Sequence, residues 1–198
     1  MKDQPGVVPS VTLSCSESNL IRLATVLQSG FIKAGTEGDS IYSFLLRLPG
    51  FTEDYLLREV QTIFYNGDAL DDLDSALAGG FATIALGSAM PGLAGAIMKK
   101  GSVCAAFRKT RTVQNVSRQG DPVQVRVKLF NTIARDRGPR LFNTGLRLDT
   151  HDLILFLELR PRLVDAFSDI IFDNTQLAPE LLIESLSSVA QIRLEVRG

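Results

Sequence analysis

Hydrophobic and polar residues alternate most regularly over residues 123–130. Apolar and polar side chains occupy alternate positions there: Val123, Val125, Val127 and Leu129 against Gln124, Arg126 and Lys128. Successive side chains of a strand point to opposite faces, so this pattern predicts a strand with one buried face and one basic, solvated face. Residues 191–196 alternate in the same way near the end of the chain and predict a second such strand.

Other segments have the apolar, β-branched or aromatic composition that is typical of strands. They are residues 8–14, 41–48, 62–66, 81–88, 102–116 and 145–148. The dipeptide Asn66-Gly67 follows an aromatic run and indicates a type I′ hairpin turn. We expect residues 102–116 to pair with 123–130 across a turn at 117–122.

Helical spacing of apolar residues at i, i+3, i+4 and i+7 predicts several helices. The predicted segments are 20–27, ended by Gly30; 52–60, capped by Thr52; 131–137, stopped by Gly138-Pro139; one from Pro161 with an apolar stripe through Ile171; and one from Pro179. Residues 153–159 fit a helix capped by Asp149 or Thr150, or equally a buried strand.

Together these elements predict an α+β fold with a mixed or antiparallel sheet and packed helices. The order strand 41–48, helix 52–60, strand 62–66, acidic turn and strand 81–88 is similar to the element order of β-grasp (ubiquitin-like) folds. This resemblance implies a fold for the N-terminal half and no function. Sulfur-carrier members of that fold need a free C-terminal Gly-Gly, whereas Gly79-Gly80 lies in mid-chain and the chain ends in Val196-Arg197-Gly198.

Residues 75–98 carry no charge and consist mostly of Gly, Ala and medium-sized aliphatic residues. The stretch is long enough to cross a bilayer, but it contains five glycines and Pro91. Each interior Gly costs a helix roughly 1 kcal/mol relative to Ala, and Pro about 3 kcal/mol. We therefore expect no membrane association, but a buried strand, a turn at Met90-Pro91-Gly92 and a small-residue segment in the core or at a subunit contact.

The 198 residues, 45% hydrophobic and 22% charged, fit a single compact domain over 1–198, with a boundary near 117–122 as the alternative. The sequence shows no internal repeat. Residues 1–10 lack the apolar run of a signal peptide, so we expect a cytoplasmic protein. Cys15 and Cys104 are expected to be reduced. With one histidine and no Cys-x-x-Cys motif, no metal or other cofactor is expected.

Charge is distributed unevenly along the chain, although the net charge is only −1. Residues 99–147 hold twelve Lys and Arg against two Asp, while the segments on both sides are acidic. A nucleic-acid-binding chain usually keeps a surplus of positive charge, which this chain cancels. We therefore expect the basic region to meet acidic protein surface, in the same chain or in a second copy, rather than nucleic acid.

A candidate anion site lies at the Gly-rich turn 87–101, where backbone N–H groups and lysines follow one another. The candidate ligand-binding residues, including the basic strands beyond the turn, are Gly92, Gly95, Lys99, Lys100, Arg108, Arg111, Arg126 and Lys128. The segment lacks the Gly-Lys-Ser/Thr of a phosphate-binding loop. A tight turn with structural lysines is the alternative interpretation.

Catalytic candidates are sparse. His151 precedes Asp152 and has the form of a general base, but no motif supplies a nucleophile, and a surface or capping role is the simpler interpretation. Cys104 lies near two lysines, and a structural cysteine is the simpler interpretation there. Asp68, Asp71, Asp72 and Asp74 offer oxygen ligands without the spacing of a calcium loop. The sequence therefore favours a non-catalytic binding or assembly protein that acts as a homo-oligomer; the alternatives are an anion binder at 87–101 and a nucleic-acid binder at 99–147.

Overall fold

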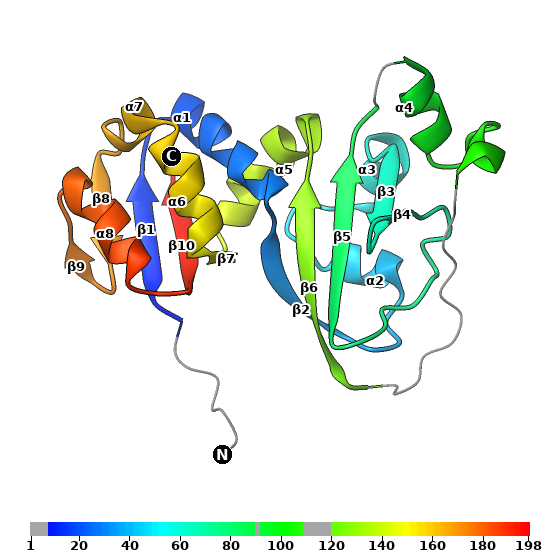
Figure 1. Ribbon diagram of the computed structural model, residues 1–198, viewed down its shortest axis with the longest axis horizontal. Helices are drawn as coiled ribbons and strands as arrows, with labels where there is room; N and C mark the ends of the chain where they lie inside the picture. The colour runs from blue at the N-terminus through cyan, green and yellow to red at the C-terminus, as the bar shows by residue number, and fades with distance from the viewer. Residues whose placement is uncertain (1–7, 90–91, 109–119) are drawn as a thin grey trace.

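A computed structural model describes residues 8–89, 92–108 and 120–198 as an α+β fold with one mixed sheet (Figure 1). The strands are β1 (Ser10–Ser14), β2 (Phe31–Thr36), β3 (Thr62–Tyr65), β4 (Asp68–Ala69), β5 (Phe81–Gly87), β6 (Pro122–Leu129), β7 (Leu146–Asp149), β8 (Asp169–Phe172), β9 (Thr175–Gln176) and β10 (Gln191–Arg197). The α-helices are α1 (Glu17–Leu23), α2 (Ile41–Leu46), α3 (Glu53–Arg58), α4 (Gly92–Met98), α5 (Thr132–Phe142), α6 (Thr150–Glu158), α7 (Pro161–Val164) and α8 (Leu182–Ser187). Short 3₁₀ turns are η1 (Ala24–Gln28), η2 (Ala105–Phe107) and η3 (Pro179–Leu181).

The sheet consists of two half-sheets with the same pairing pattern. The first half-sheet has the order β4-β3-β5-β6-β2, and the second has the order β9-β8-β1-β10-β7. In each, the two-residue outer strand and its neighbour form a hairpin, the next pair is antiparallel, the third pair is parallel and the last is antiparallel. The two half-sheets thus share one strand arrangement, although the sequence shows no internal repeat.

The half-sheets meet at β2 and β7 through one paired position, Ile32 opposite Arg147. Two helical connections cross this junction. The α1–η1 segment leads from β1 in the second half-sheet to β2 in the first, and α5 leads from β6 back to β7. These connections touch where Gly138 of α5 meets Ala24, so closely that a Cβ atom at Gly138 would lie 2.5 Å from the Ala24 Cβ.

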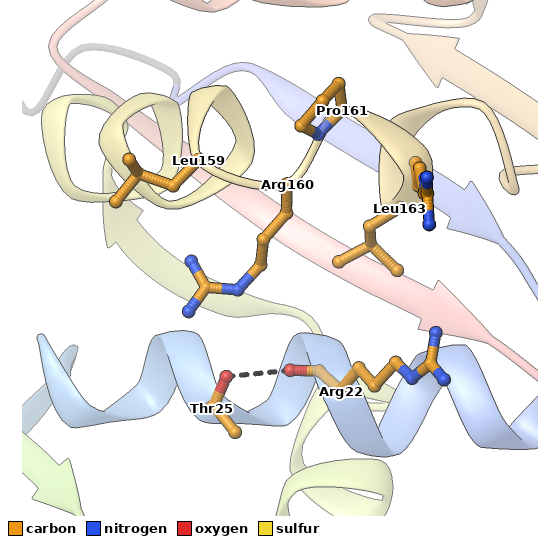
Figure 2. Close-up of a pocket in the computed structure, with 7 residues that line it drawn as sticks. Arg22, Thr25, Leu159, Arg160, Pro161 and Leu163 are labelled. Atoms are coloured by element: carbon orange, nitrogen blue, oxygen red, sulfur yellow. Dashed lines mark hydrogen bonds between the residues drawn. The ribbon is translucent and has the colours of Figure 1, made fainter.

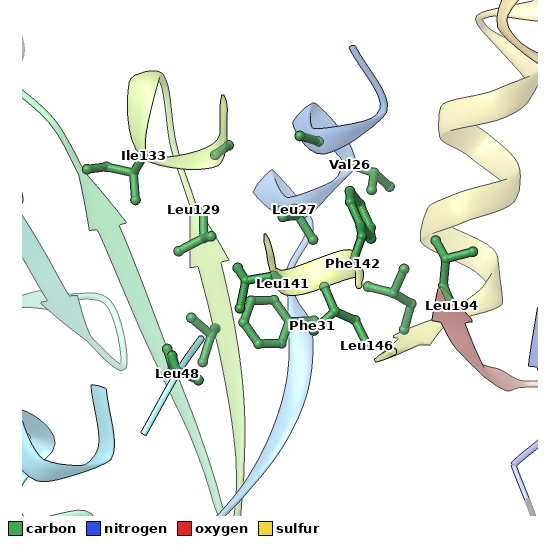
Figure 3. Packing of buried hydrophobic residues seen from close by; sticks show 14 of the residues in the cluster. Val26, Leu27, Phe31, Leu48, Leu129, Ile133, Leu141, Phe142, Leu146 and Leu194 are labelled. Carbon is green, nitrogen blue, oxygen red and sulfur yellow. The ribbon is translucent and has the colours of Figure 1, made fainter. Parts of the chain in front are cut away.

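One hydrophobic cluster extends across both half-sheets. Figure 3 shows Leu141 and Phe142 of α5 between Leu129 of the first half-sheet and Leu146 and Leu194 of the second. All five side chains are buried. Helix α5 therefore supplies much of the apolar contact that holds the half-sheets together.

The helices cover different sides of the two half-sheets in Figure 1: α6 and α8 lie in front of the second, and α2 and α3 lie behind the first. On the uncovered face of the first half-sheet, Phe81 is exposed, and Ala85 and Lys128 are half-buried. Both edges of the sheet end in strands of two residues, β4 and β9. Such short edges offer little backbone for pairing with another chain.

The alternating strands and the first hairpin are confirmed. Strand β6 buries its valines as predicted, while its polar face has Gln124 exposed and Arg126 and Lys128 half-buried. Strand β10 alternates likewise. The turn at Asn66-Gly67 has φ of 51° and 90°, in the left-handed region that a type I′ turn requires. Thr52 caps α3 by accepting a hydrogen bond from the Tyr55 N–H. The second half-sheet has a corresponding hairpin at Asp173-Asn174, which the sequence analysis did not identify.

The predicted strand 41–48 is wrong, because Ile41–Leu46 forms helix α2. Ser40 caps this helix through the Ser43 N–H, and Ile41, Phe44 and Leu45 are buried at helical spacing. The segment is so apolar that its helical spacing could not be distinguished from a strand pattern in the sequence. Strand β2 was missed. The β-grasp resemblance, which began with the strand at 41–48, is not confirmed.

Three further predictions differ from the structure. The expected hairpin of 102–116 with 123–130 is wrong over the described part, since η2 lies there and β6 pairs with β5 and β2. Helix α5 continues through Gly138-Pro139 to Phe142. The stripe beyond Pro161 divides into the short helix α7 and strand β8. In each case, the local residue pattern did not show which distant segments of the chain would pack against it.

Residues 81–87 form β5 as predicted, but only the face with Ala82, Ile84 and Leu86 is buried, and Phe81 is 52% exposed. Helix α4 follows, and its Leu93 is 73% exposed, so the small-residue segment does not lie wholly in the core as the first alternative expected. Positions 90 and 91 of the predicted turn lie outside the described residues. No helix among the residues that the structure describes combines the length and apolar character needed to span a membrane. The alternative boundary at 117–122 stays a prediction; β6 begins at Pro122, the last residue of that range.

Candidate binding surface

The predicted anion site at 87–101 does not gather its residues into one cradle. Gly92 begins α4 with open space around it, Gly95 is buried, and Lys99 is exposed beyond the helix. Arg111 lies outside the described residues. Helix α4 has only seven residues, and nothing in the described part of the chain indicates an anion at its start.

Lys100 and Arg108 are internal anchors. The Lys100 ammonium donates to the Leu56 carbonyl over 2.9 Å, and burial lowers the pKa of this lysine below its ordinary value. The Arg108 side chain, only 2% exposed, donates to the Met98 carbonyl and pairs with Asp71. These bonds hold the α4–η2 segment against α3 and the loop after β4, which supports the structural interpretation of both residues.

Arg126 and Lys128 lie on the uncovered face of β6, some way from that segment along the sheet. Arg126 forms ion pairs with Asp149, the residue before α6, and with Asp152 in its first turn. The stems of both basic side chains lie close to Gly30. Basic and acidic side chains thus pair within the chain at this point, between β6 and α6. The expected contact of the basic region with a second copy stays a prediction.

Neither catalytic candidate makes a side-chain hydrogen bond or ion pair with another described residue. His151 is exposed in the first turn of α6, and Cys104 is half-buried beside η2. Among the residues described by the structure, no group of three or more His, Cys, Asp or Glu side chains is placed to hold a metal ion.

Helix α6 carries an unusual exposed face. Leu153, Phe156 and Leu157 are buried in the core, which decides for a helix where the sequence alone left helix and strand open. On the outer face, Leu155 is 47% exposed and Leu159, just beyond the helix, is 80% exposed. Residues four apart lie on one side of a helix, so His151, Leu155 and Leu159 form one ridge, hereafter the α6 ridge.

A groove runs along one flank of the α6 ridge, between α1–η1 and the α6–α7 corner. Two cavities of about 430 and 400 Å³ share Thr25, Leu159 and Arg160, and so form one continuous groove. Figure 2 shows Arg160 pointing from the corner toward Thr25, with Arg22 below along α1. Leu163 contributes a buried apolar wall.

Arg22, Arg160 and Arg162 line the first of these cavities, and we call the whole groove the arginine groove after them. Asp152, which pairs with Arg126, lines the second cavity. The Arg160 guanidinium stacks 3.9 Å from the centre of the Phe156 ring and donates to the Phe156 carbonyl. None of the three arginines forms an ion pair with any residue in the described part of the chain. Their charges are therefore open to a partner.

The opposite flank of the α6 ridge carries the opposite charge. A cavity of about 210 Å³ lies between the α6–α7 corner and the η3–α8 segment, and Glu158, Asp165 and Glu180 line it. All three carboxylates are exposed and, within the described ranges, unpaired. Leu181 beside Glu180 is 46% exposed. We call this flank the acidic groove.

A third hollow lies on the uncovered face of the first half-sheet. Its volume is about 300 Å³, and its lining consists of uncharged residues: Thr62, Phe64, Ala85, Gly87, Phe130 and Asn131. This lining offers no charge that would select a partner, so the hollow indicates less about the chemistry of a partner than the two grooves beside α6 do.

Comparison of the chain with models of protein families, with curated proteins and with solved structures gives no match. The functional interpretation therefore depends on the surface itself. Sequence analysis missed this surface, although the i, i+4 spacing of Leu155 and Leu159 was visible. Without the fold, an exposed leucine pair cannot be distinguished from the core leucines beside it.

Proposed function

We propose that the protein is a non-catalytic binding or assembly protein, and that it binds its partner through the α6 ridge and the arginine groove. The observation that carries this proposal is the pair of exposed leucines, Leu155 and Leu159, beside a groove with unpaired arginines. Contiguous apolar surface rimmed by polar groups is typical of protein interaction sites.

The energetics favour an apolar contact oriented by charge. Full burial of a leucine side chain is worth on the order of 1.5–3 kcal/mol, so covering Leu159 alone supplies a substantial part of a binding free energy. Exposed arginines around the rim contribute mainly to orientation and association rate. The partner surface is therefore expected to combine apolar side chains with carboxylates.

The two alternative functions have weaker support from the geometry. An anion binder at 87–101 would use Lys100 and Arg108, which are already bonded within the chain. A nucleic-acid binder would use Arg126, which is paired with two aspartates. Within the part of the chain that the structure describes, the side chains of Arg22 and Arg162 in the arginine groove make no such competing contacts.

Peptide display tests the proposed function. The full chain is immobilised at low density, so that copies stay apart, and a library of random peptides is selected on it. Bound peptides are then counter-selected on the Leu159→Glu variant. We expect the retained peptides to be rich in both apolar and acidic residues, and to shift the backbone amide NMR signals of Leu155 and Leu159.

The matched control is Leu57→Glu, which changes a leucine 56% exposed on α3, away from the groove. This variant should bind the selected peptides as the wild type does. Enrichment that Leu159→Glu leaves intact, or no enrichment above a blank surface, would contradict the proposed function.

A further inference from the structure

We infer that the partner is a second copy of this chain, in a dimer with a twofold axis that runs along the α6 ridge. The inference rests on the proposed function and adds the identity of the partner. Its basis is that the two flanks of the α6 ridge are complementary to each other: three unpaired arginines on one side and three unpaired carboxylates on the other.

The sequence interleaves these charges, and the fold separates them. Arg160 and Arg162 lie between Glu158 and Asp165 along the chain. The turn from α6 into α7 directs the arginines toward α1 and the carboxylates toward η3–α8. A single chain cannot bring the two flanks together, because α6 lies between them. Two copies can.

Symmetry selects the arrangement of the two copies. A twofold axis along α6 keeps the two α6 helices parallel and exchanges their flanks, so that each arginine groove faces an acidic groove. An axis across α6 would make the helices antiparallel and set arginines against arginines, which electrostatic repulsion disfavours. The charge pattern therefore specifies a parallel, isologous contact.

The apolar residues fit the same contact. Leu155 and Leu159 lie at its centre, where each meets its counterpart across the axis, and Leu181 lies beside the acidic flank. Burial at the centre with charge at the rim is the usual organisation of a protein interface. Assembly through the sheet edges is not an equivalent alternative, because β4 and β9 have two residues each.

Charge exchange between two variants tests the dimer. One variant carries Arg22→Glu and Arg162→Glu, which reverses the basic flank. The other carries Glu158→Arg and Asp165→Arg, which reverses the acidic flank. Neither pair makes a side-chain hydrogen bond among the described residues, so both variants should fold. Sedimentation velocity is measured from low micromolar to near-millimolar protein.

We expect the wild type to associate reversibly, and each variant alone to associate on the order of 100-fold more weakly, because both flanks then face like charges. Mixing the two variants should restore the dimer, since the reversed basic flank of one variant then faces the reversed acidic flank of the other. A folding defect or an unrelated partner does not predict this rescue. One variant carries acidic groups on both flanks and the other carries basic groups on both, so the rescue tests the pairing of charge and not the direction of the helices. Higher salt should reduce the rescue.

Cysteine cross-linking tests the direction of the helices. In a Cys15→Ser, Cys104→Ser background, Leu155→Cys and Leu159→Cys should each form a disulfide with the same residue of the second copy. When the two cysteine variants are mixed, a preferred disulfide between position 155 of one copy and position 159 of the other would indicate antiparallel helices. That result would overturn the parallel arrangement.

The outcomes separate the two proposals. A wild type that stays monomeric at every concentration, or variants that dimerise alone as the wild type does, would overturn the dimer. If display peptides still depend on Leu159, the groove binds a different partner and the proposed function stands. The control Arg58→Glu, an exposed charge reversal on α3, should leave association unchanged.

Discussion

The contact between Gly138 and Ala24 provides the sharpest test of how the two half-sheets are joined. Gly138 lies inside α5, and its φ is not in the left-handed region, so alanine fits the backbone there. However, the added Cβ would lie 2.5 Å from the Ala24 Cβ and 3.4 Å from Leu27 Cδ1. Gly138→Ala should therefore destabilise the fold.

The size of the effect follows from two opposing terms. Replacing an interior helical Gly by Ala stabilises a helix by about 1 kcal/mol. Overpacking a core costs about 1–3 kcal/mol, and the upper value applies here because neither methyl group has a rotamer with which to move away. The net loss is roughly 2 kcal/mol, which lowers the Tm of a chain of this size by about 4–8 °C.

The reciprocal exchange isolates the contact. Ala24→Gly alone should cost about 2 kcal/mol through lost burial and helix propensity. The double variant removes the clash and keeps the alanine gain at 138, so its loss should be only about 1 kcal/mol, against about 4 kcal/mol if the two changes were additive. Chemical unfolding of the four proteins measures this coupling.

Two results would refute this reasoning. A Gly138→Ala variant more stable than the wild type would show that α5 and η1 are farther apart at this point. A double variant whose loss equals the sum of the single losses would show that the instability of Gly138→Ala has another cause.

Three further expectations concern other parts of the fold. Arg126→Glu combined with Lys128→Glu should lower the Tm, more strongly at low salt, because repulsion from the acidic start of α6 is then least screened; equal Tm changes at two salt concentrations would contradict this. Burial raises the pKa of Tyr55 from 10.0 to about 12, partly opposed by the Arg137 guanidinium on its ring; stability should therefore fall as pH rises through that window, and Tyr55→Phe should reduce the fall in unfolding titrations. Gly67→Ala, at φ 90°, should cost roughly 1–2 kcal/mol, whereas Gly80→Ala, without a positive φ and with open space around it, should be nearly neutral by the same measurement.

Local patterns correctly predicted the elements that have one face in water and the other face in the core. The alternation in β6, the Asn66-Gly67 turn and the Thr52 cap are properties of a few adjacent residues, and the structure has them as expected. The sequence also determined the α+β class, because strand and helix periods both occur along the chain.

Local patterns failed where burial removes the period. In α2 the run from Ile41 is so apolar that a helix and a strand give similar sequences, and only the Ser40 cap distinguishes them. Helix α5 continues through Pro139 because tertiary contacts at Gly138, Leu141 and Phe142 outweigh the local preference to stop. Strands that pair, such as β5 and β6, lie too far apart in sequence for local residue patterns to predict the pairing.

The proposed binding surface depends on tertiary structure alone. The chain specifies leucines at 155 and 159 and interleaved charges from 158 to 165, but a helix can bury any of its faces. Only the packing of α6 on the second half-sheet leaves those leucines in water and sends Arg162 and Asp165 to opposite flanks. The physical reason is that exposure is a property of neighbours in space, which the order of residues along the chain does not contain.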